Sequence, residues 1–586
     1  MNKKDLILNI LLFISQIIVF YYFFCYLFPF KEQLQMFQFT SQYLTETLKQ
    51  AGGVAIYISE FLSQFYVVFW TGPIISALLL TLVALLSSLI LKKINSRNDL
   101  PLIFLLPWLS LLIISLDYDY YEQGTIAYLF LLLFLWLYTN IKTRIKFIYG
   151  ICIIPILYGI AGPIVHLFAI SALFFEFLTN GKKKYISIIY LLIAALSAIA
   201  GTYLGYSRNL TLAFLPEAYC NPLQTVSGIY YAWYALPMTM LLVVYLKRYK
   251  EPVSLKGKCI WEGAQWAIMF LLVYQGIFHF GKLDAQHSMK QDYLLRTEQW
   301  DLVISEFNHD VLSKRRMCGL NLALAHKGQL SERLLDYPQH GIETLMLHWD
   351  QSIYTAQLHS DLYYCMGIIS AAQKFAFEAF VSSRSSGNPR MLKRLIETNL
   401  ITGSYPIADK YIQLLEKTWF YKDWATAHRR FLYNDKAVEE DKILGMKRRC
   451  WKAEASAAKL YTDPVSSLIN LLPACPDNKA GLAYLTSFLL LNKDIETYKT
   501  LQESLYRSPA WRDMTECQQE AIVICSPNDP HFWLEHGVSI KVRNRAIAFM
   551  QKVQDVSRSG QNLAVALASE YGKTYWYYYM FNMMDK

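Results

Sequence analysis

Apolar residues in the first half of the chain occur in runs long enough to cross a bilayer. A hydrocarbon core about 30 Å thick needs about 20 apolar residues in a helix. The candidate spans are residues 6–28, 66–91, 100–116, 124–141, 147–160, 163–179, 185–204, 229–246 and 260–280. The first run exceeds the roughly 7–15 residues of a secretory-signal core, and no small-residue cleavage site follows it. We therefore predict about nine spans, the first of them uncleaved.

Residues 147–179 decide how many times the chain crosses. As one helix they would extend about 50 Å, well beyond the hydrocarbon thickness. Gly159, Gly162 and Pro163 stand where a hairpin would turn. Two spans are therefore predicted here rather than one.

Lysine and arginine are distributed unevenly among the connectors. With nine spans and a cytoplasmic N-terminus, 16 of them lie in the inside segments and three, Lys31, Lys49 and Arg208, in the outside loops. The positive-inside rule predicts such a bias. Merging 147–179 into one span would move Lys182–Lys184 outside and invert every later loop. We expect a multi-pass protein of a bacterial inner membrane with residues 281–586 in the periplasm.

The second half has a different composition and a different periodicity. Charged residues number 31 in residues 1–280 and 71 in residues 281–586. Apolar positions in 281–586 recur every three or four residues, which is typical of amphipathic helices. The sequence predicts an all-α protein with a membrane domain at 1–280 and an extramembrane domain at 281–586. The net charge of the second half is only +3, which argues against a nucleic-acid partner.

Three segments of the second half resemble one another in sequence. They are residues 297–304, 327–334 and 402–409, each placed after a helix-like stretch. The segments resemble tetratricopeptide repeats, in which a glycine and an aromatic residue mark the turn and a small residue allows close packing. The positions that carry this resemblance are Trp300, Gly328, Gly403, Tyr405 and Ala408.

The three segments also differ from the tetratricopeptide pattern. Glu298 and Val303 stand where Gly and Ala are usual, Arg333 takes a small-residue position, and the first two copies are 30 residues apart. The family period is about 34. We predict a degenerate array of helix pairs, whose stack leaves an extended surface for a protein or peptide partner. A purely structural cap remains the alternative. The aromatic tail 575–581 either packs on the array or rests at the bilayer surface.

Two predicted outside loops carry acidic residues. Glu60 lies near the entry of the second span, either as a carboxylate held at the membrane surface or on the solvated face of an interfacial helix. Asp117 and Asp119 form an Asp-x-Asp pair, which either binds a divalent cation beside a phosphate or makes a short acidic turn. No Cys-x-x-Cys, His-Glu-x-x-His or Walker-type motif occurs, so we predict no metal or cofactor outside the cation interpretation.

Two resemblances extend this interpretation. The stretch AGGVAIYISEFLSQF at 51–65, the nine spans and the helical tail resemble an uncharacterised bacterial family of multi-pass membrane proteins, which implies an architecture and no activity. The layout is also similar to GT-C membrane glycosyltransferases. That likeness implies a polyprenyl-phosphate sugar donor, with Glu60 (or Glu32) and Asp117 with Asp119 as base or metal ligands. The first loop has no Asp, which departs from that group.

These observations favour a membrane anchor that presents a helical array to partners in the cell envelope, with membrane lipids around its spans. The alternative is a GT-C-like glycosyltransferase in which Glu60, Asp117 and Asp119 are catalytic. No motif identifies a reaction, so the sequence leaves open whether the protein is an enzyme.

Overall fold

The chain is helical throughout the part that the structure describes. The computed structural model describes residues 3–96, 100, 102–179, 185–221, 226, 228–249, 254–307, 313–383, 387–456, 463–505 and 514–581. Within these ranges there is no β-strand, and one isolated bridge joins Tyr120 to Cys220. The predicted all-α class is confirmed. The described chain forms two compact units, unit 1 (1–289 with 417–420) and unit 2 (290–416 and 421–586).

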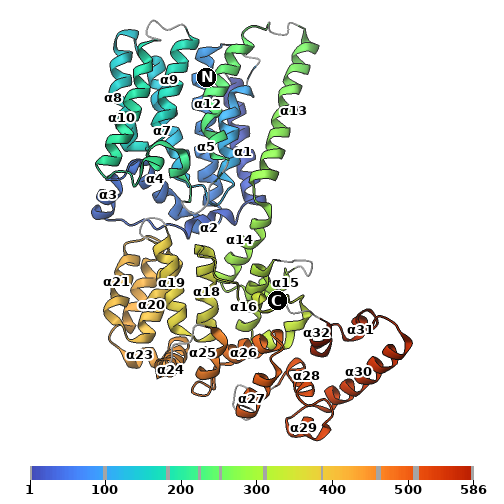
Figure 1. Cartoon of the computed structure of the whole chain (residues 1–586). Helices are drawn as coiled ribbons and strands as arrows, with labels where there is room; N and C mark the ends of the chain where they lie inside the picture. Colours follow the sequence, from blue (N-terminus) through green and yellow to red (C-terminus); the bar gives the residue numbers. More distant parts are fainter. Residues whose placement is uncertain are drawn as a thin grey trace. The chain divides into compact units, whose positions relative to one another are not determined.

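Unit 1 is a helical bundle with a set of short helices between its first two long ones (Figure 1). Its elements are α1 (Lys3–Phe23), α2 (Leu27–Glu32), α3 (Ser41–Leu48), α4 (Gly53–Ser63), η1 (Gln64–Val67), α5 (Thr71–Ile94), η2 (Ile103–Leu105), α6 (Leu106–Ser115), α7 (Glu122–Asn140), α8 (Thr143–Ala161), α9 (Val165–Leu178), η3 (Ile186–Ile188), α10 (Ile189–Tyr203), α11 (Leu210–Phe214), η4 (Pro216–Tyr219), α12 (Ile229–Leu246) and α13 (Leu255–Phe280). The chain passes from unit 1 to unit 2 within α14 (Leu283–Arg296).

Each predicted span coincides with a helix, and several helices are long and apolar enough to cross a membrane. Four described helices meet that standard, namely α1 from Asp5, α5, α7 and α12. A fifth is α13 together with α14, which are bent by 57° at their junction. The helices at 103–115, 145–161, 165–178 and 189–203 are apolar but shorter. Four to five candidate spans are therefore established among the described residues, and nine stays a prediction.

The predicted hairpin within 147–179 is confirmed. Helix α8 ends at Ala161 and α9 begins at Val165, with Gly162 between them at φ +82°. A side chain disfavours that backbone conformation, so glycine is suited to the turn. Gly52 packs on the same end of α8, where its N–H donates to Tyr158 O (3.2 Å) and Gly159 O (3.1 Å). Gly52 of the 51–65 stretch thus bonds to carbonyls at a helix end.

Unit 2 consists of short helices joined mainly by tight turns. They are α15 (Trp300–Ser305), α16 (Lys314–His326), α17 (Leu330–Arg333), η5 (Leu334–Asp336), η6 (Ile342–Thr344), α18 (Ile353–Met366), α19 (Ile369–Ser382), α20 (Pro389–Thr402), α21 (Tyr405–Glu416), α22 (Lys422–His428), η7 (Arg429–Phe431), α23 (Asp435–Glu440), α24 (Lys442–Ser456), α25 (Pro464–Leu471), α26 (Lys479–Leu491), α27 (Ile495–Leu505), α28 (Glu516–Cys525), α29 (Pro530–Glu535), α30 (Ile540–Ser559), α31 (Leu563–Tyr571) and α32 (Tyr575–Phe581).

One turn recurs between consecutive helices of unit 2. It joins α14 to α15, α16 to α17, α18 to α19, α20 to α21, α26 to α27, and α29 to α30. In each turn one residue has a positive φ, and the next residue's N–H donates to the carbonyl five residues before it, as in a Schellman motif. The positive-φ residues are Glu298 (58°), Gly328 (70°), Gly367 (86°), Gly403 (75°), Lys493 (56°) and Gly537 (77°). The bonds are Gln299 to Leu294 (2.9 Å), Gln329 to Leu324 (2.8 Å), Ile368 to Tyr363 (3.0 Å), Ser404 to Asn399 (2.9 Å), Asp494 to Leu489 (2.9 Å) and Val538 to Trp533 (2.9 Å).

Side chains of helix α24 bond to the backbone at the ends of three of these helices. Two of its cations meet carbonyls at helix C-termini, and one of its carboxylates meets amides at a helix N-terminus, which suits the partial charges there. The contacts are Lys447 Nζ to Cys365 O (2.9 Å), Arg448 Nε to Ile401 O (3.0 Å), Arg448 Nη2 to Leu400 O (2.7 Å), and Ile369 and Ser370 N–H to Glu454 Oε2 (3.0 and 3.2 Å). The arrangement of α18, α19 and α20 is therefore stabilised by a helix that comes later in the sequence.

The aromatic tail packs inside unit 2, the first of the two alternatives. Tyr575, Trp576 and Tyr578 are buried. The Tyr575 N–H donates to Glu520 Oε2 (2.6 Å), and the Trp576 indole N–H donates to the Glu520 carbonyl (3.0 Å). Burial raises the pKa of the Glu520 carboxyl to about 7, although the Tyr575 N–H and Arg545 oppose that change.

The recurring turn predicts a graded response to alanine. Gly403→Ala is expected to lower the free energy of unfolding by about 1 kcal/mol, since its cost is backbone strain alone. A Cβ at Gly367 would also lie 2.8 Å from Asn478 Nδ2 and 3.2 Å from Cys450 Sγ. Gly367→Ala should therefore cost about 2–4 kcal/mol. Thermal unfolding of the full chain in detergent measures both. Glu298→Gly is the control and should stabilise, and equal losses for the two alanine variants would contradict this account.

Glu520 predicts a pH dependence of stability. Its folded pKa of about 7 lies above the ordinary 4.5, so protonation stabilises the fold at low pH. That contribution is complete below pH 4.5 and is lost as pH rises through about 7. Glu520→Gln keeps an acceptor for Tyr575 and should flatten the melting temperature across this range, with a gain of about 1–3 kcal/mol above it. Glu535→Gln, at an exposed position of α29, is the control. A slope unchanged by Glu520→Gln would refute the assignment.

Candidate functional site

The connector between α6 and α7 is held by a second connector. Backbone bonds join the two around the Tyr120–Cys220 bridge: Tyr121 N–H donates to Tyr219 O (2.9 Å) and Asn221 N–H to Asp119 O (2.9 Å). The Asn221 side-chain amide also donates to Asp119 Oδ1 (3.0 Å). Asp119 thus has a fixed position although it lies outside any helix.

Lys282 pairs with both aspartates of this connector. Its Nζ lies 2.9 Å from Asp117 Oδ1 and 3.2 Å from Asp119 Oδ2, and it lies over the Tyr118 ring, 4.3 Å from the centroid. The Asp117 and Asp119 side chains are 6% and 0% exposed, whereas Lys282 is 35% exposed. Lys282 is therefore the most exposed side chain of the triad, and the two aspartates are buried.

A second lysine is buried close to these acids. Lys31 of α2 donates from Nζ to the Ser115 carbonyl (2.9 Å) at the end of α6. Burial lowers the pKa of the Lys31 ammonium, and the Glu122, Asp117 and Asp119 carboxylates oppose that effect. Glu122 Oε1 is buried, and no hydrogen-bond partner is found for it among the described residues. The site thus combines two cations with three carboxylates at one end of α6.

Cys220 is not an activated nucleophile in this environment. Burial, reinforced by the negative charge of Asp117 and Asp119, raises the pKa of its thiol to about 12. Because the thiolate is the reactive form, Cys220 stays a neutral thiol near neutral pH.

The acids of the first long loop have other partners. Glu60 of α4 is buried and accepts a hydrogen bond from the Tyr43 hydroxyl of α3. Glu32 is also buried and accepts from the Gln33 side chain. Glu60 is thus bonded to Tyr43 of α3, whereas Asp117 and Asp119 are bonded to Lys282.

The described residues contain no group of three His, Cys, Asp or Glu side chains arranged to hold a metal ion. At Asp117 and Asp119 the Lys282 ammonium bonds to both carboxylates. It supplies there the positive charge that a divalent cation between the two would supply.

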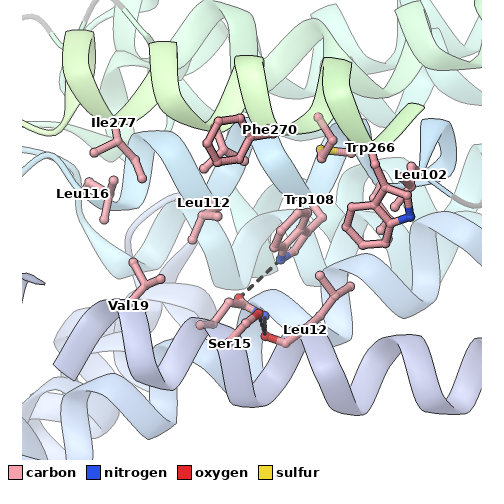
Figure 2. Close-up of a pocket in the computed structure, with 14 residues that line it drawn as sticks. Leu12, Ser15, Val19, Leu102, Trp108, Leu112, Leu116, Trp266, Phe270 and Ile277 are labelled. Carbon is pink, nitrogen blue, oxygen red and sulfur yellow. Dashed lines mark hydrogen bonds between the residues drawn. The ribbon is translucent and has the colours of Figure 1, made fainter. Parts of the chain in front are cut away.

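An apolar cavity of about 230 Å³ lies between α1, α6 and α13. Figure 2 shows Leu116 and Ile277 at one end of it and Leu102 and Trp266 at the other. Glu60, Asp117 and Asp119 are not among the described residues that line it. Leu116, however, directly precedes Asp117. The cavity therefore ends beside the charged cluster.

The five residues predicted at repeat turns lie in four kinds of environment in unit 2. Trp300 stacks on His326 at 4.1 Å between centroids. Gly328 and Gly403 take the left-handed conformation. Ala408 is fully buried. The Tyr405 hydroxyl donates to Asp435 (2.5 Å) and accepts from Arg448 (2.9 Å). These are packing and turn positions, with no reactive group among them.

The sequence gives little indication that Lys31 and Lys282 belong to one site. Each is an isolated lysine at the edge of an apolar run. The partner of Lys31 is 84 residues away in sequence, and those of Lys282 are 163–165 residues away.

The fold and this site define an α-helical protein in which four to five described helices are long and apolar enough to span a membrane. The chain belongs to a family of unknown function, DUF6057, whose family model matches residues 2–582. No curated protein and no solved structure matches it.

The ion triad predicts how the charges depend on one another. Lys282→Met should lower the free energy of unfolding by about 1–3 kcal/mol, because it leaves two buried carboxylates without their cation. Lys282→Arg should cost less. Adding Asp119→Asn to Lys282→Met should recover part of the loss, giving a coupling energy in a double-mutant cycle. Thermal unfolding in detergent is the measurement. Strictly additive losses would show that the coupling energy between Lys282 and Asp119 is zero.

Proposed function

We propose that this protein is a membrane anchor whose unit 2 binds a polypeptide partner in the cell envelope. The observation that carries the proposal is a cleft of about 530 Å³ within unit 2, formed by residues 335–341 and the end of the chain around α32. Small-molecule and peptide sites are typically concave regions of this size. The recurring helix pairs support an extended array of the tetratricopeptide-like kind, a fold that generally serves binding.

The lining of the cleft suits a polypeptide. Tyr577 and Phe581 lie with ring centroids 4.8 Å apart, and aromatic residues are enriched where proteins meet. His340 is exposed, and Lys573 lies 3.8 Å from Asp336. Rigid rings beside exposed polar and charged groups provide both apolar contact and hydrogen bonds to a peptide backbone.

We propose the periplasm as the compartment, and residues 281–586 as an extramembrane domain, on the 16-to-3 distribution of cations. Several of the inside cations, Arg97, Lys182–Lys184 and Lys250, lie outside the described residues. The proposal for the compartment therefore rests on the sequence.

Site-specific photocrosslinking in intact cells tests the proposal. A photoreactive amino acid at His340 should give one discrete polypeptide adduct, whose attachment point is mapped by mass spectrometry. Lys436, 85% exposed on α23 and outside the cleft, is the matched control position. Tyr577→Ala should reduce the adduct about 5–10-fold, as expected for loss of an interface aromatic. Alkaline phosphatase fused after Lys586 should be active if unit 2 is periplasmic.

Two results would count against partner binding. One is the same adduct from Lys436 as from His340, which would indicate random proximity. The other is no adduct from His340 in a protein that keeps its normal thermal transition. An inactive phosphatase fusion would instead reject the compartment and leave the cleft to be tested in the cytosol.

A second candidate is sugar transfer from a polyprenyl-phosphate donor, with Glu60 and the Asp117–Asp119 pair as base or cation ligands. The burial of these three carboxylates in predicted outside loops favours it. Lys282 weighs against it, because its ammonium already bonds to both Asp117 and Asp119. Turnover that is lost in Asp119→Asn and kept in Asp5→Asn would favour transfer over anchoring.

A further inference from the structure

Two cysteines of unit 2 lie side by side in its core. Cys450 belongs to α24, and Cys475 lies in the connector between α25 and α26. Their exposed fractions are 0% and 3%. The Cys450 thiol donates a hydrogen bond to the Cys475 sulfur. Both are thiols in this structure, so the pair is a reduced dithiol.

The end of α18 contacts both cysteines or their neighbours. The Asn478 N–H donates to the Cys475 carbonyl (3.1 Å). The Asn478 side chain donates to Met366 O (2.7 Å), the last residue of α18. A Cβ added to the next residue, Gly367, would lie 3.2 Å from Cys450 Sγ. The same turn thus packs on Cys450 and anchors the connector that carries Cys475, which fixes the two sulfurs in contact.

The surroundings favour reaction at Cys475. The hydrogen bond from Cys450 lowers the pKa of the Cys475 thiol, and the charges of Arg449 and Lys447 act in the same direction, whereas burial opposes them. Donating that bond raises the pKa of the Cys450 thiol, and burial raises it further. Because the thiolate is the nucleophile in thiol–disulfide exchange, Cys475 is the sulfur that attacks first.

A third thiol nearby provides a comparison. Cys365 of α18 is 3% exposed, and its carbonyl accepts from Lys447 Nζ (2.9 Å). Burial raises the pKa of its thiol to about 11, although Lys447 opposes that change. Cys365 is therefore a buried, protonated thiol close to the same lysine, without the sulfur–sulfur hydrogen bond that joins Cys450 to Cys475.

We propose that Cys450 and Cys475 are oxidised to a disulfide in the mature protein. The oxidant is a disulfide, R–S–S–R, of an envelope thiol oxidant. The Cys475 thiolate attacks one of its sulfurs, forms a mixed disulfide and releases R–S⁻. Cys450 then gives its proton to water and attacks the Cys475 sulfur, which closes the Cys450–Cys475 bond and releases the second R–S⁻. Two protein thiols are oxidised, and one oxidant disulfide is reduced to two thiols.

The burial of the pair dates this reaction to folding. An oxidant reaches Cys450 and Cys475 only before α24 and the connector pack together. A disulfide bond of about 2.05 Å is shorter than a hydrogen-bonded contact, so the side chains rotate toward each other as the bond forms. The bond would join α24, which already bonds to the ends of α18, α19 and α20, to the connector before α26.

This modification goes beyond partner binding and rests on the proposed compartment. Disulfides form and persist in oxidising compartments such as the bacterial periplasm. The two cysteines are 25 positions apart in sequence. A cross-link over a loop of this length stabilises a protein mainly by restricting its unfolded chain.

Differential alkylation of the full chain tests the bond. Cells are lysed in denaturant with N-ethylmaleimide, which blocks free thiols, and the protein is digested with trypsin without reductant. Trypsin leaves Cys450 in peptide 450–452 and Cys475 in peptide 460–479. These two peptides should be recovered as one linked species that separates on reduction, in at least about tenfold excess over their alkylated forms. Cys365 should be alkylated without reduction.

The melting temperature in detergent provides a second measurement. A phosphine reductant should lower it by about 5–10 °C in the wild type, because the loop is no longer closed. Cys475→Ala should melt at the same temperature with and without reductant, whatever the substitution itself costs. Cys365→Ala is the matched control and should keep the wild-type response to reductant.

Other results would overturn this pairing. Full alkylation of Cys450 and Cys475 without reduction would refute the disulfide, and the phosphatase fusion would show separately whether the compartment fails with it. Linkage of Cys475 to a different cysteine, or a response of Cys475→Ala to reductant equal to that of the wild type, would also refute it. A linked pair beside an inactive fusion would keep the disulfide and reject the compartment. None of these results bears on the photocrosslink at His340.

Discussion

The contact of Lys282 with Asp117 and Asp119 is the constraint on which the end of unit 1 depends. It joins residues 163–165 positions apart and fixes the end of α13, a helix with much of its apolar surface exposed. The same aspartates are held by Asn221 and by the Tyr120–Cys220 bridge. Charges that burial would otherwise destabilise are thus matched to one another. The bend between α13 and α14 is placed at this contact.

Unit 2 depends on a different principle, the left-handed residue that ends a helix. Six turns among the described residues use it, and glycine occupies four of them, since Glu298 and Lys493 take the same conformation. The hydrogen bond from the following N–H repeats in all six. Local geometry therefore persists where residue identity does not. Helix α24 adds long-range contacts that local turns cannot provide, because Lys447, Arg448 and Glu454 meet the ends of other helices.

This difference explains what could be predicted from the sequence. Apolar runs located the helices of unit 1, because a run's length and composition are local properties, and Gly162 located the hairpin for the same reason. The similarity among residues 297–304, 327–334 and 402–409 located the turns at Glu298, Gly328 and Gly403 but missed those at Gly367, Lys493 and Gly537. Gly367 is followed by Ile368 and Ile369 rather than a polar and an aromatic residue, and Lys493 gives no glycine signal. The sequence alone does not identify Lys282 and Lys31 as site residues, because their partners are distant in sequence.

The buried charges also bear on which chemistry unit 1 can perform. Asp119 is fully buried, bonds to Lys282 and Asn221, and has the backbone of its neighbours fixed by a bridge. A general base must reach a substrate proton and bind it, whereas this carboxylate is shielded by the ammonium. The Lys282 side chain, by contrast, is 35% exposed, but its ammonium bonds to both carboxylates and lies over the Tyr118 ring. Catalysis by the aspartates would therefore require Lys282 to move away first.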